Sequence, residues 1–173
     1  LTSWNGMMIA ALAKAGKVYG KEEYITRAEK AIHFIEDKLI VDGRLMARYR
    51  DGEAKYKAYL DDYAFLLWGY IELYEATFTP NYLEKATHLA DDMIKLFSDQ
   101  ENGGFYFTGR DGEQLISNDT EVQDGAIPSG NSTAANMLIR LGLLTGERSF
   151  TEQADEMFYT FFEDVNRQAS ASP

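Results

Sequence analysis

Two adjacent carboxylates, Asp61 and Asp62, stand between Tyr59 and Tyr63 at the head of a strongly apolar segment. After this head, no charged residue occurs in the segment until Glu72. A helix that is apolar on every side must lie inside a larger assembly, so its polar head is the part that can meet a ligand. A pair of carboxylic acids at such a place can act as general acid and general base.

Glu121 and Asp124 are the further acids that could join this pair as catalytic residues. At a glycosidic or hemiacetal carbon, the separation of two carboxylates decides the mechanism. The sequence gives no such distance, and acidic loop residues are usually solvated. Three arginines near the predicted turns, Arg48, Arg50 and Arg110, either pair with these acids or bind an anionic group.

Two other apolar segments begin with polar heads, one containing Trp4 and Asn5 and the other Ser129 and Asn131. Aromatic faces stack on the apolar side of a sugar ring, while carboxylates and amides bind its hydroxyl groups. The candidate ligand-binding residues are Trp4, Asn5, Tyr59, Tyr63, Tyr106, Ser129 and Asn131. A second interpretation fits equally well, in which Ser and Asp residues at these heads cap helices. Since only one of the two adjacent aspartates can be a cap, its neighbour is the stronger candidate for a ligand.

Each polar head begins an apolar helix, and each apolar helix is followed by an amphipathic one. The three pairs occupy about residues 3–39, 60–97 and 129–165. Equivalent apolar positions of the amphipathic helices align between the pairs. The aligned aromatic positions are Tyr24, Tyr82 and Phe150. The repeating unit is therefore an αα-hairpin.

Long connections, residues 40–58 and 98–128, separate the three pairs. Each contains an Asp-Gly dipeptide, at positions 51–52 and 111–112, which predicts a small β-hairpin or a turn. Because the three apolar helices run parallel, their heads and both long connections meet at one end. Long connections of this kind are usually functional or disordered, and the aromatic residues and predicted small hairpins favour a functional role. This end is therefore the expected active face.

Buried helices wrapped by amphipathic ones are typical of an α/α toroid. We therefore expect an all-α fold, in which residues 1–173 form one partial domain with three αα-hairpins of a six-hairpin, (α/α)6 glycosidase-like toroid and small β-hairpins in the long loops. Half a toroid leaves apolar flanks uncovered. The chain should cover them with a missing part of a longer protein or by self-association through its open edge.

Composition excludes several classes of partner. A formal net charge of −11 argues against binding to nucleic acid or to an anionic membrane, since both need clustered Lys and Arg. The chain has no cysteine, which excludes disulfides and thiolate metal sites. We expect no metal, no cofactor and a cytoplasmic location. Both histidines, His33 and His88, fall in amphipathic helices, which counts against an epimerase that uses an inward histidine base.

Three motifs occur in one order along the chain. They are Leu1-Thr2-Ser3-Trp4-Asn5-Gly6, Leu60-Asp61-Asp62-Tyr63-Ala64 and Asp124-Gly125-Ala126-Ile127-Pro128-Ser129-Gly130-Asn131-Ser132. Together they resemble the YyaL family of thioredoxin-domain-containing proteins, which is related to spermatogenesis-associated protein 20. The resemblance implies a six-hairpin toroid similar to N-acylglucosamine 2-epimerases and six-hairpin glycosidases, preceded by a thioredoxin-like domain that is absent here. It carries over no catalytic residue, but it places the following motif positions at the toroid mouth: Trp4, Asn5, Asp61, Asp62, Tyr63, Ser129 and Asn131.

The leading hypothesis is a partial YyaL-like toroid that binds or acts on a carbohydrate. In the full-length protein it would be glycosidase- or epimerase-like, with Asp61 or Asp62 and Glu121 or Asp124 as acid and base. The alternative is a non-enzymatic interaction domain that serves the missing thioredoxin-like domain. The expected partners are a sugar ligand and the remainder of the parent chain.

Overall fold

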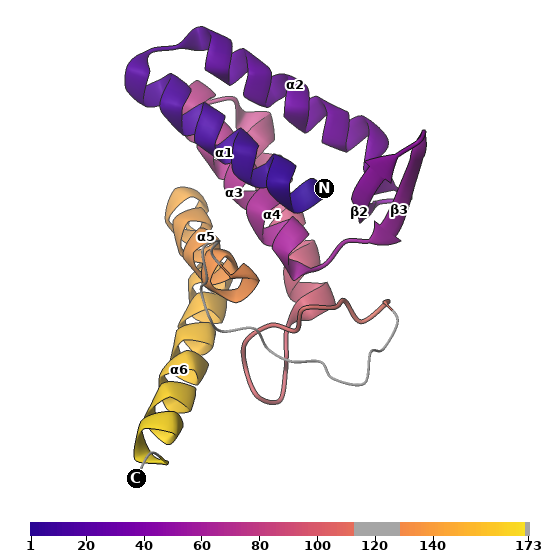
Figure 1. The fold of residues 1–173 in the computed structure, drawn as a ribbon. Coiled ribbons are helices and arrows are strands. Elements are labelled where there is room, and N and C mark those ends of the chain that lie inside the picture. The colour runs from indigo at the N-terminus through magenta and orange to yellow at the C-terminus, as the bar shows by residue number, and fades with distance from the viewer. Residues whose placement is uncertain (113–128, 172–173) are drawn as a thin grey trace.

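The computed structural model describes residues 1–112 and 129–171. This part of the chain contains six helices and three short strands (Figure 1). In chain order the elements are α1 Thr2–Tyr19, α2 Glu22–Lys38, β1 Ile40–Val41, β2 Arg44–Arg50, β3 Glu53–Lys57, α3 Leu60–Thr77, α4 Pro80–Phe97, α5 Gly130–Thr145 and α6 Arg148–Ser170. The helices form three successive αα-hairpins, each with an inner and an outer member.

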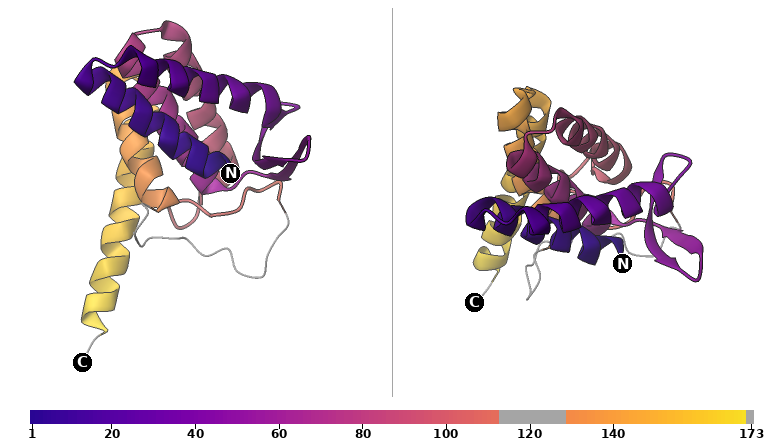
Figure 2. Two further views of the ribbon diagram at one scale, coloured as in Figure 1. Left: turned by 45° about the horizontal axis from the view of Figure 1, so that its top comes forward. Right: turned by 90° about the horizontal axis from the view of Figure 1, so that it is seen from above.

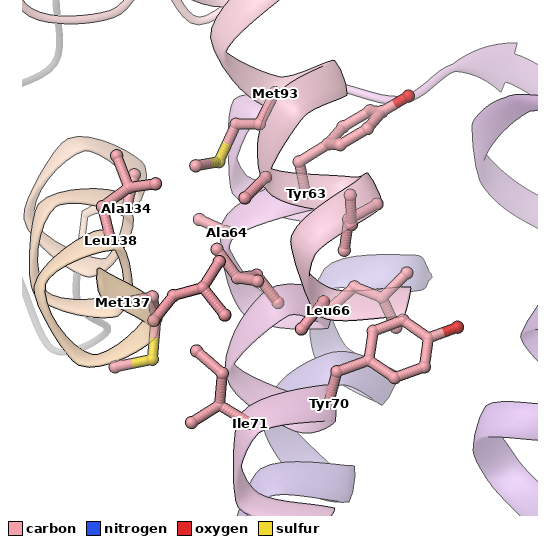
Figure 3. Packing of buried hydrophobic residues seen from close by; sticks show 14 of the residues in the cluster. Tyr63, Ala64, Leu66, Tyr70, Ile71, Met93, Ala134, Met137 and Leu138 are labelled. Carbon is pink, nitrogen blue, oxygen red and sulfur yellow. The ribbon is translucent and has the colours of Figure 1, made fainter. Parts of the chain in front are cut away.

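The inner helix α3 lies at the centre of the molecule. Its residues are apolar on nearly every side, and it packs against α1, α4 and α5. Figure 3 shows how Met93 of α4 and Ala134 and Leu138 of α5 gather around it. Burial of an aliphatic side chain contributes about 1.5 to 3 kcal/mol, so this cluster is the main source of stability.

The outer helices α2 and α4 are amphipathic and bury one face each. Ile25, Ile32 and Ile35 form the buried face of α2, at helical spacing. The inner helices α1 and α5 end at glycines in the left-handed region, Gly20 with φ 64° and Gly146 with φ 75°. Glycine adopts this conformation without strain, which lets the chain reverse at once into the outer helix.

The first long connection forms a three-stranded antiparallel sheet, in the order β1-β2-β3. Both of its turns are Asp-Gly pairs with positive φ at each residue, at positions 42–43 and 51–52. Two such residues make the mirror-image turn that matches the twist of a hairpin. The hairpin predicted at positions 51–52 is therefore present, and a second turn at positions 42–43 extends it.

The Asp-Gly pair at positions 111–112 lies at the end of a described range, where Gly112 N donates to the carbonyl oxygen of Gly109 and closes a turn. Phe105 makes an isolated bridge to Ser98, and residues 106–112 form turns and irregular backbone. The segment that would complete a hairpin at this turn lies outside the described residues. The side-chain amide of Asn131 in α5 forms hydrogen bonds with the backbone N–H and carbonyl groups of Phe105. The carboxylate of Asp111 accepts a hydrogen bond from Arg44.

Helices α1 and α3 approach so closely that only glycine fits between them. A Cβ atom on Gly6 would lie 2.7 Å from the backbone nitrogen of Leu66 and 2.7 Å from the carbonyl carbon of Phe65. Gly69 of α3 faces the same contact, since a Cβ there would lie 3.2 Å from the carbonyl oxygen of Gly6. Backbone atoms cannot move aside as a flexible side chain can.

Changing Gly6 to Ala is therefore expected to lower the free energy of unfolding by about 1 to 3 kcal/mol, the range for an overpacked core. Helix propensity alone would give the opposite sign, a gain of about 1 kcal/mol. Ala11→Gly, at an exposed position of the same helix, is the matched control and should cost about 1 kcal/mol. Urea unfolding followed by circular dichroism measures both changes. A Gly6→Ala variant as stable as the parent would contradict the close contact.

Helix α6 extends past the other helices at its C-terminal end (Figures 1 and 2). Exposed apolar side chains gather on it, including Tyr159 and Phe162, which are 69% and 67% exposed. Self-association through this open edge stays a prediction. Within residues 1–112 and 129–171, no helix has the length and apolar character needed to cross a membrane.

Candidate functional site

Asp62 ties the first turns of α1 and α3 together. Its Oδ2 accepts a hydrogen bond from the backbone nitrogen of Tyr59 at 2.8 Å, and its Oδ1 accepts one from the backbone nitrogen of Ser3 at 2.9 Å. The side chain is 5% exposed. Helix N-termini leave backbone N–H groups without intrahelical partners, and this carboxylate satisfies one at each helix. Of the two adjacent aspartates, Asp62 is thus the cap.

Asp61 lies between the heads of α3 and α5. A Cβ atom on Gly130 would fall 2.1 Å from Asp61 Oδ1, so the absence of a side chain at Gly130 is what lets the carboxylate sit against the first turn of α5. The positive end of a helix dipole favours a negative charge at this place. Asp61 is half-buried, and Asp62 rather than Asp61 caps α3.

At the head of α5, Ser129 and Asn131 have structural roles. Ser129 Oγ accepts a hydrogen bond from the backbone nitrogen of Ser132 at 3.1 Å and so caps the helix. Asn131 Oδ1 accepts from the backbone nitrogen of Phe105, and its Nδ2 donates to the carbonyl oxygen of Phe105, each at 3.0 Å. The amide thereby pairs with the loop backbone as a neighbouring strand would. It fixes the connection that follows α4 to the inner helix α5.

The aromatic residues among the predicted site residues differ in their exposure to solvent. Trp4 is 54% exposed on α1, and Tyr59 stacks on Phe107 with ring centroids 4.9 Å apart. Tyr106 is half-buried, and its hydroxyl donates to the carboxylate of Asp99, which raises the pKa of that tyrosine. Tyr63 is 1% exposed and lies in the core, and a ligand-binding role for it stays a prediction.

Asn5 is half-buried on α1, one residue after Trp4. The predicted acids Glu121 and Asp124 lie outside the described residues. Of the predicted site residues, the structure brings Asp61, Asp62, Ser129 and Asn131 to one end of the inner helices, with Trp4 and Tyr59 beside them.

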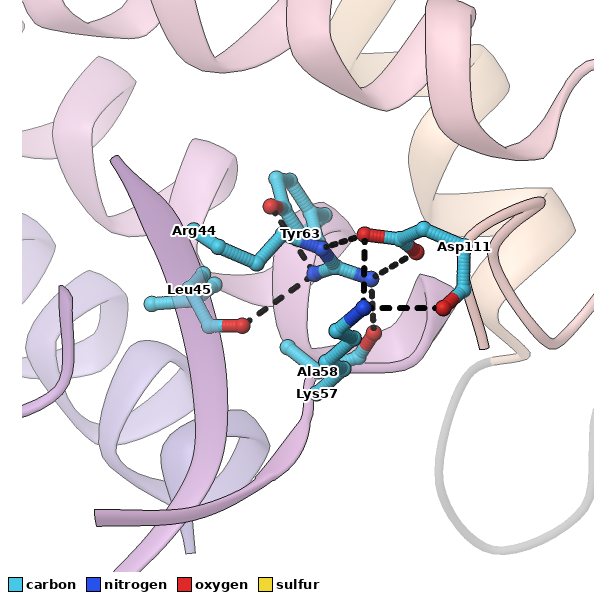
Figure 4. Close-up of polar contacts among 6 residues, drawn as sticks. All are labelled: Arg44, Leu45, Lys57, Ala58, Tyr63 and Asp111. Atoms are coloured by element: carbon cyan, nitrogen blue, oxygen red, sulfur yellow. Dashed lines mark hydrogen bonds and ion pairs between the residues drawn. The ribbon is translucent and has the colours of Figure 1, made fainter. Parts of the chain in front are cut away.

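The sequence analysis missed Arg44, which holds the loops at this end (Figure 4). Its guanidinium binds Asp111 through two bonds, Nε to Oδ2 at 2.8 Å and Nη2 to Oδ1 at 2.9 Å. Nη1 donates to the hydroxyl of Tyr63 at 3.1 Å, and Lys57 Nζ donates to the carbonyl oxygen of Asp111 at 2.9 Å. The Arg44 guanidinium holds the pKa of the Asp111 carboxyl below its usual range. The signal for Arg44 was its place directly after the overlooked Asp42-Gly43 turn.

The three arginines predicted to pair with the candidate acids or to bind an anionic group make other contacts among the described residues, and their pairing with Glu121 or Asp124 stays a prediction. Arg48 lies over the ring of Tyr56, 4.8 Å from its centroid. Arg110 donates to the carbonyl oxygen of Ser98 at 2.6 Å. Arg50 contacts only its exposed neighbour Asp51, at 3.8 Å, among the ion pairs of the described residues.

A comparison with protein-family models finds no match. Spermatogenesis-associated protein 20 of Rattus norvegicus is 33% identical over 184 residues, an alignment that takes in 100% of this chain and 23% of that protein. The chain is a spermatogenesis-associated protein 20-like region. The resemblance expected from the three motifs is thereby confirmed. This region spans about a quarter of the length of the curated relatives that it matches.

Solved structures confirm the fold of this spermatogenesis-associated protein 20-like region. The GH76 alpha-mannanase of Bacteroides thetaiotaomicron matches with a TM-score of 0.71 at 15% identity, over 92% of this chain and 43% of that one. Cellobiose 2-epimerase of Bacillus thermoamylovorans matches with a TM-score of 0.72 at 16% identity, over 94% of this chain and 44% of that one. The predicted three-hairpin part of a six-hairpin toroid is therefore correct.

Proposed function

We propose that this region binds a carbohydrate at the end of the toroid where the first turns of α1, α3 and α5 meet. The observation that carries the proposal is the bond from the backbone nitrogen of Ser3 to Asp62. Ser3 directly precedes the exposed Trp4, and Asp62 directly follows Asp61. This single bond holds together the first turns of α1 and α3, which carry the exposed Trp4 and the carboxylate of Asp61.

An indole and a carboxylate on one rim suit a sugar ligand. The indole offers a flat apolar face for a pyranose ring, and the carboxylate accepts hydrogen bonds from its hydroxyl groups. The stacked pair of Tyr59 and Phe107 adds a second aromatic surface at this end. Two solved structures of similar fold are named as a mannanase and a cellobiose 2-epimerase, which supports the same class of ligand.

In the intact protein we assign Asp61 the role of acid or base. Asp62 is less suited to direct contact with a ligand, because both of its oxygens already accept backbone hydrogen bonds. Glu121 or Asp124 is the proposed partner of Asp61, and the distance between the two carboxylates would decide between a retaining and an inverting mechanism.

A screen of mono- and oligosaccharides against the intact protein tests the proposal. Trp4→Ala is expected to weaken sugar binding about tenfold, because the stacking face is lost. Tyr19→Ala, an exposed aromatic at the opposite end of α1, is the matched control and should leave binding unchanged. Asp61→Asn should weaken binding and abolish any turnover, whereas Asp91→Asn on the exposed face of α4 should do neither. Failure to bind any sugar, or binding that survives both Trp4→Ala and Asp61→Asn, would exclude the proposal.

A further inference from the structure

A second cleft lies on the outer side of the molecule, between the two outer helices α2 and α4. Its volume is about 460 Å³, and α3 forms its floor with Tyr63, Leu66 and Tyr70. Figure 3 shows the hydroxyl groups of Tyr63 and Tyr70 pointing away from α5. The cleft therefore opens on the opposite side of α3 from α5.

Two polar contacts bridge α2 and α4, and the partners of the second one, Lys85 and Glu36, line this cleft. The hydroxyl of Tyr82 donates to Glu29 Oε2 at 2.5 Å, and Lys85 Nζ donates to Glu36 Oε2. The walls of the cleft carry more acids than bases. Its described lining contains the acids Glu36, Glu84 and Asp92, and the basic residues Lys85 and His88.

Two polar groups of the cleft lack a hydrogen-bond partner among the described residues. Glu36 Oε1 is buried and accepts no bond from the protein. Tyr70 is 3% exposed, and its hydroxyl forms no hydrogen bond within residues 1–112 and 129–171. Buried polar groups are normally hydrogen-bonded. Tyr70 and Glu36 both line the cleft, so a ligand there can supply a partner to the Tyr70 hydroxyl and lie beside the Glu36 carboxylate.

The charges and shape of the cleft decide what kind of ligand can do so. A carboxylate oxygen needs a donor, and the excess of negative charge favours a cation over a neutral or anionic molecule. Leu66 and Leu89 make part of the lining apolar, which suits a short carbon chain. A phenolic hydroxyl can donate or accept, so it suits a second polar group on the same molecule.

We propose that this cleft binds a small amino alcohol, whose ammonium group pairs with the carboxylate of Glu36 and whose hydroxyl pairs with Tyr70 while its carbon chain lies against Leu66. The site is separate from the rim that contains Trp4 and Asp61, and it does not depend on the sugar proposal. Glu36 keeps its bond to Lys85 through the other carboxylate oxygen.

Three probes of equal length but different charge test this site by calorimetry on the intact protein: aminohexanol, hexanediol and hydroxyhexanoate. Aminohexanol is expected to bind at least about tenfold more tightly than hexanediol, and hydroxyhexanoate should not bind. Equal binding of the three probes, or no binding of aminohexanol, would overturn the proposal.

Two variants identify the groups that bind the probe. Glu36→Gln removes the charge but keeps an oxygen for Lys85, and it should weaken aminohexanol binding about tenfold. Tyr70→Phe removes only a hydroxyl that has no hydrogen bond to the described residues, so the variant should fold normally and weaken binding by about threefold or more. The matched controls are Glu23→Gln, exposed on α2, and Tyr74→Phe, one turn farther along α3 and outside the cleft lining.

Each outcome of the variant experiment decides the proposal. Loss of affinity in Glu36→Gln and Tyr70→Phe with normal affinity in both controls supports it. Unchanged affinity in Tyr70→Phe, which remains informative even where Glu36→Gln does not fold, overturns it. Trp4→Ala should leave aminohexanol binding unchanged, which separates this result from the test of sugar binding.

Discussion

Replacing Arg140 with Gln is expected to lower the free energy of unfolding by about 3 to 5 kcal/mol, because it leaves a buried carboxylate without its counter-charge. Arg140 Nη2 lies 2.6 Å from Glu72 Oε1 and 3.1 Å from Glu75 Oε2. Glu72 is 4% exposed, so water screens its charge little. These contacts join α5 to α3 beyond the apolar core. Guanidinium unfolding followed by circular dichroism measures the loss.

Arg148→Gln is the matched control, because Arg148 is exposed at the start of α6 and should contribute little. The double variant Arg140→Gln with Glu72→Gln should recover much of the loss, since a neutral amide is less costly to bury than an unpaired charge. An equal loss in Arg148→Gln, or a double variant less stable than Arg140→Gln alone, would contradict this explanation.

The stability of the fold is also expected to fall as the pH rises from about 4 to about 7, through the titration of Asp62. Burial raises the pKa of this carboxyl from 3.8 to about 6, although the N–H groups of Tyr59 and Ser3 act in the opposite direction. In the unfolded chain the proton is lost near the ordinary value. Between these two pKa values only the folded chain keeps the proton, so protonation favours folding. This contribution is complete below about pH 4 and is lost as the pH rises through about 6.

The increase of about two pH units in the pKa corresponds to about 3 kcal/mol. The stability of the parent chain relative to Asp62→Asn should therefore decrease by about 3 kcal/mol between about pH 4 and pH 7, because the amide does not titrate. Urea unfolding of both proteins across this range measures the difference. Asp37→Asn, at an exposed position of α2, should run parallel to the parent. Parallel curves for Asp62→Asn and the parent would show that burial does not perturb this group.

Helix pairs could be predicted because their signals are local. The apolar run after Tyr63 and the spacing of Ile25, Ile32 and Ile35 each depend on residues one or two turns apart. The turn at positions 51–52 could be predicted for the same reason. A turn also occurs at residues 109–112, where Gly112 N donates to the carbonyl oxygen of Gly109. The contact of Asp111 with Arg44 was not predicted, because no local pattern encodes a contact between residues so far apart in sequence.

The candidate site was predictable only in part. The sequence indicated that one of two adjacent aspartates is a cap, but it could not say which one. Asp62 has this role because its carboxylate reaches the backbone of both Tyr59 and Ser3, and Ser3 is fifty-nine residues away. The burial of Tyr63 likewise depends on contacts with Arg44 and Phe97 that lie far apart in sequence.

The pairing of Arg44 with Asp111 has a consequence for the order in which the chain folds. These residues are 67 positions apart, whereas each αα-hairpin closes on contacts between neighbours in sequence. Contacts between distant segments cost more chain entropy to close, so they form after local ones. Interactions that are absent from the folding transition state act mainly on the rate of unfolding. We therefore expect the pairing of Arg44 with Asp111 to slow unfolding more than it speeds folding.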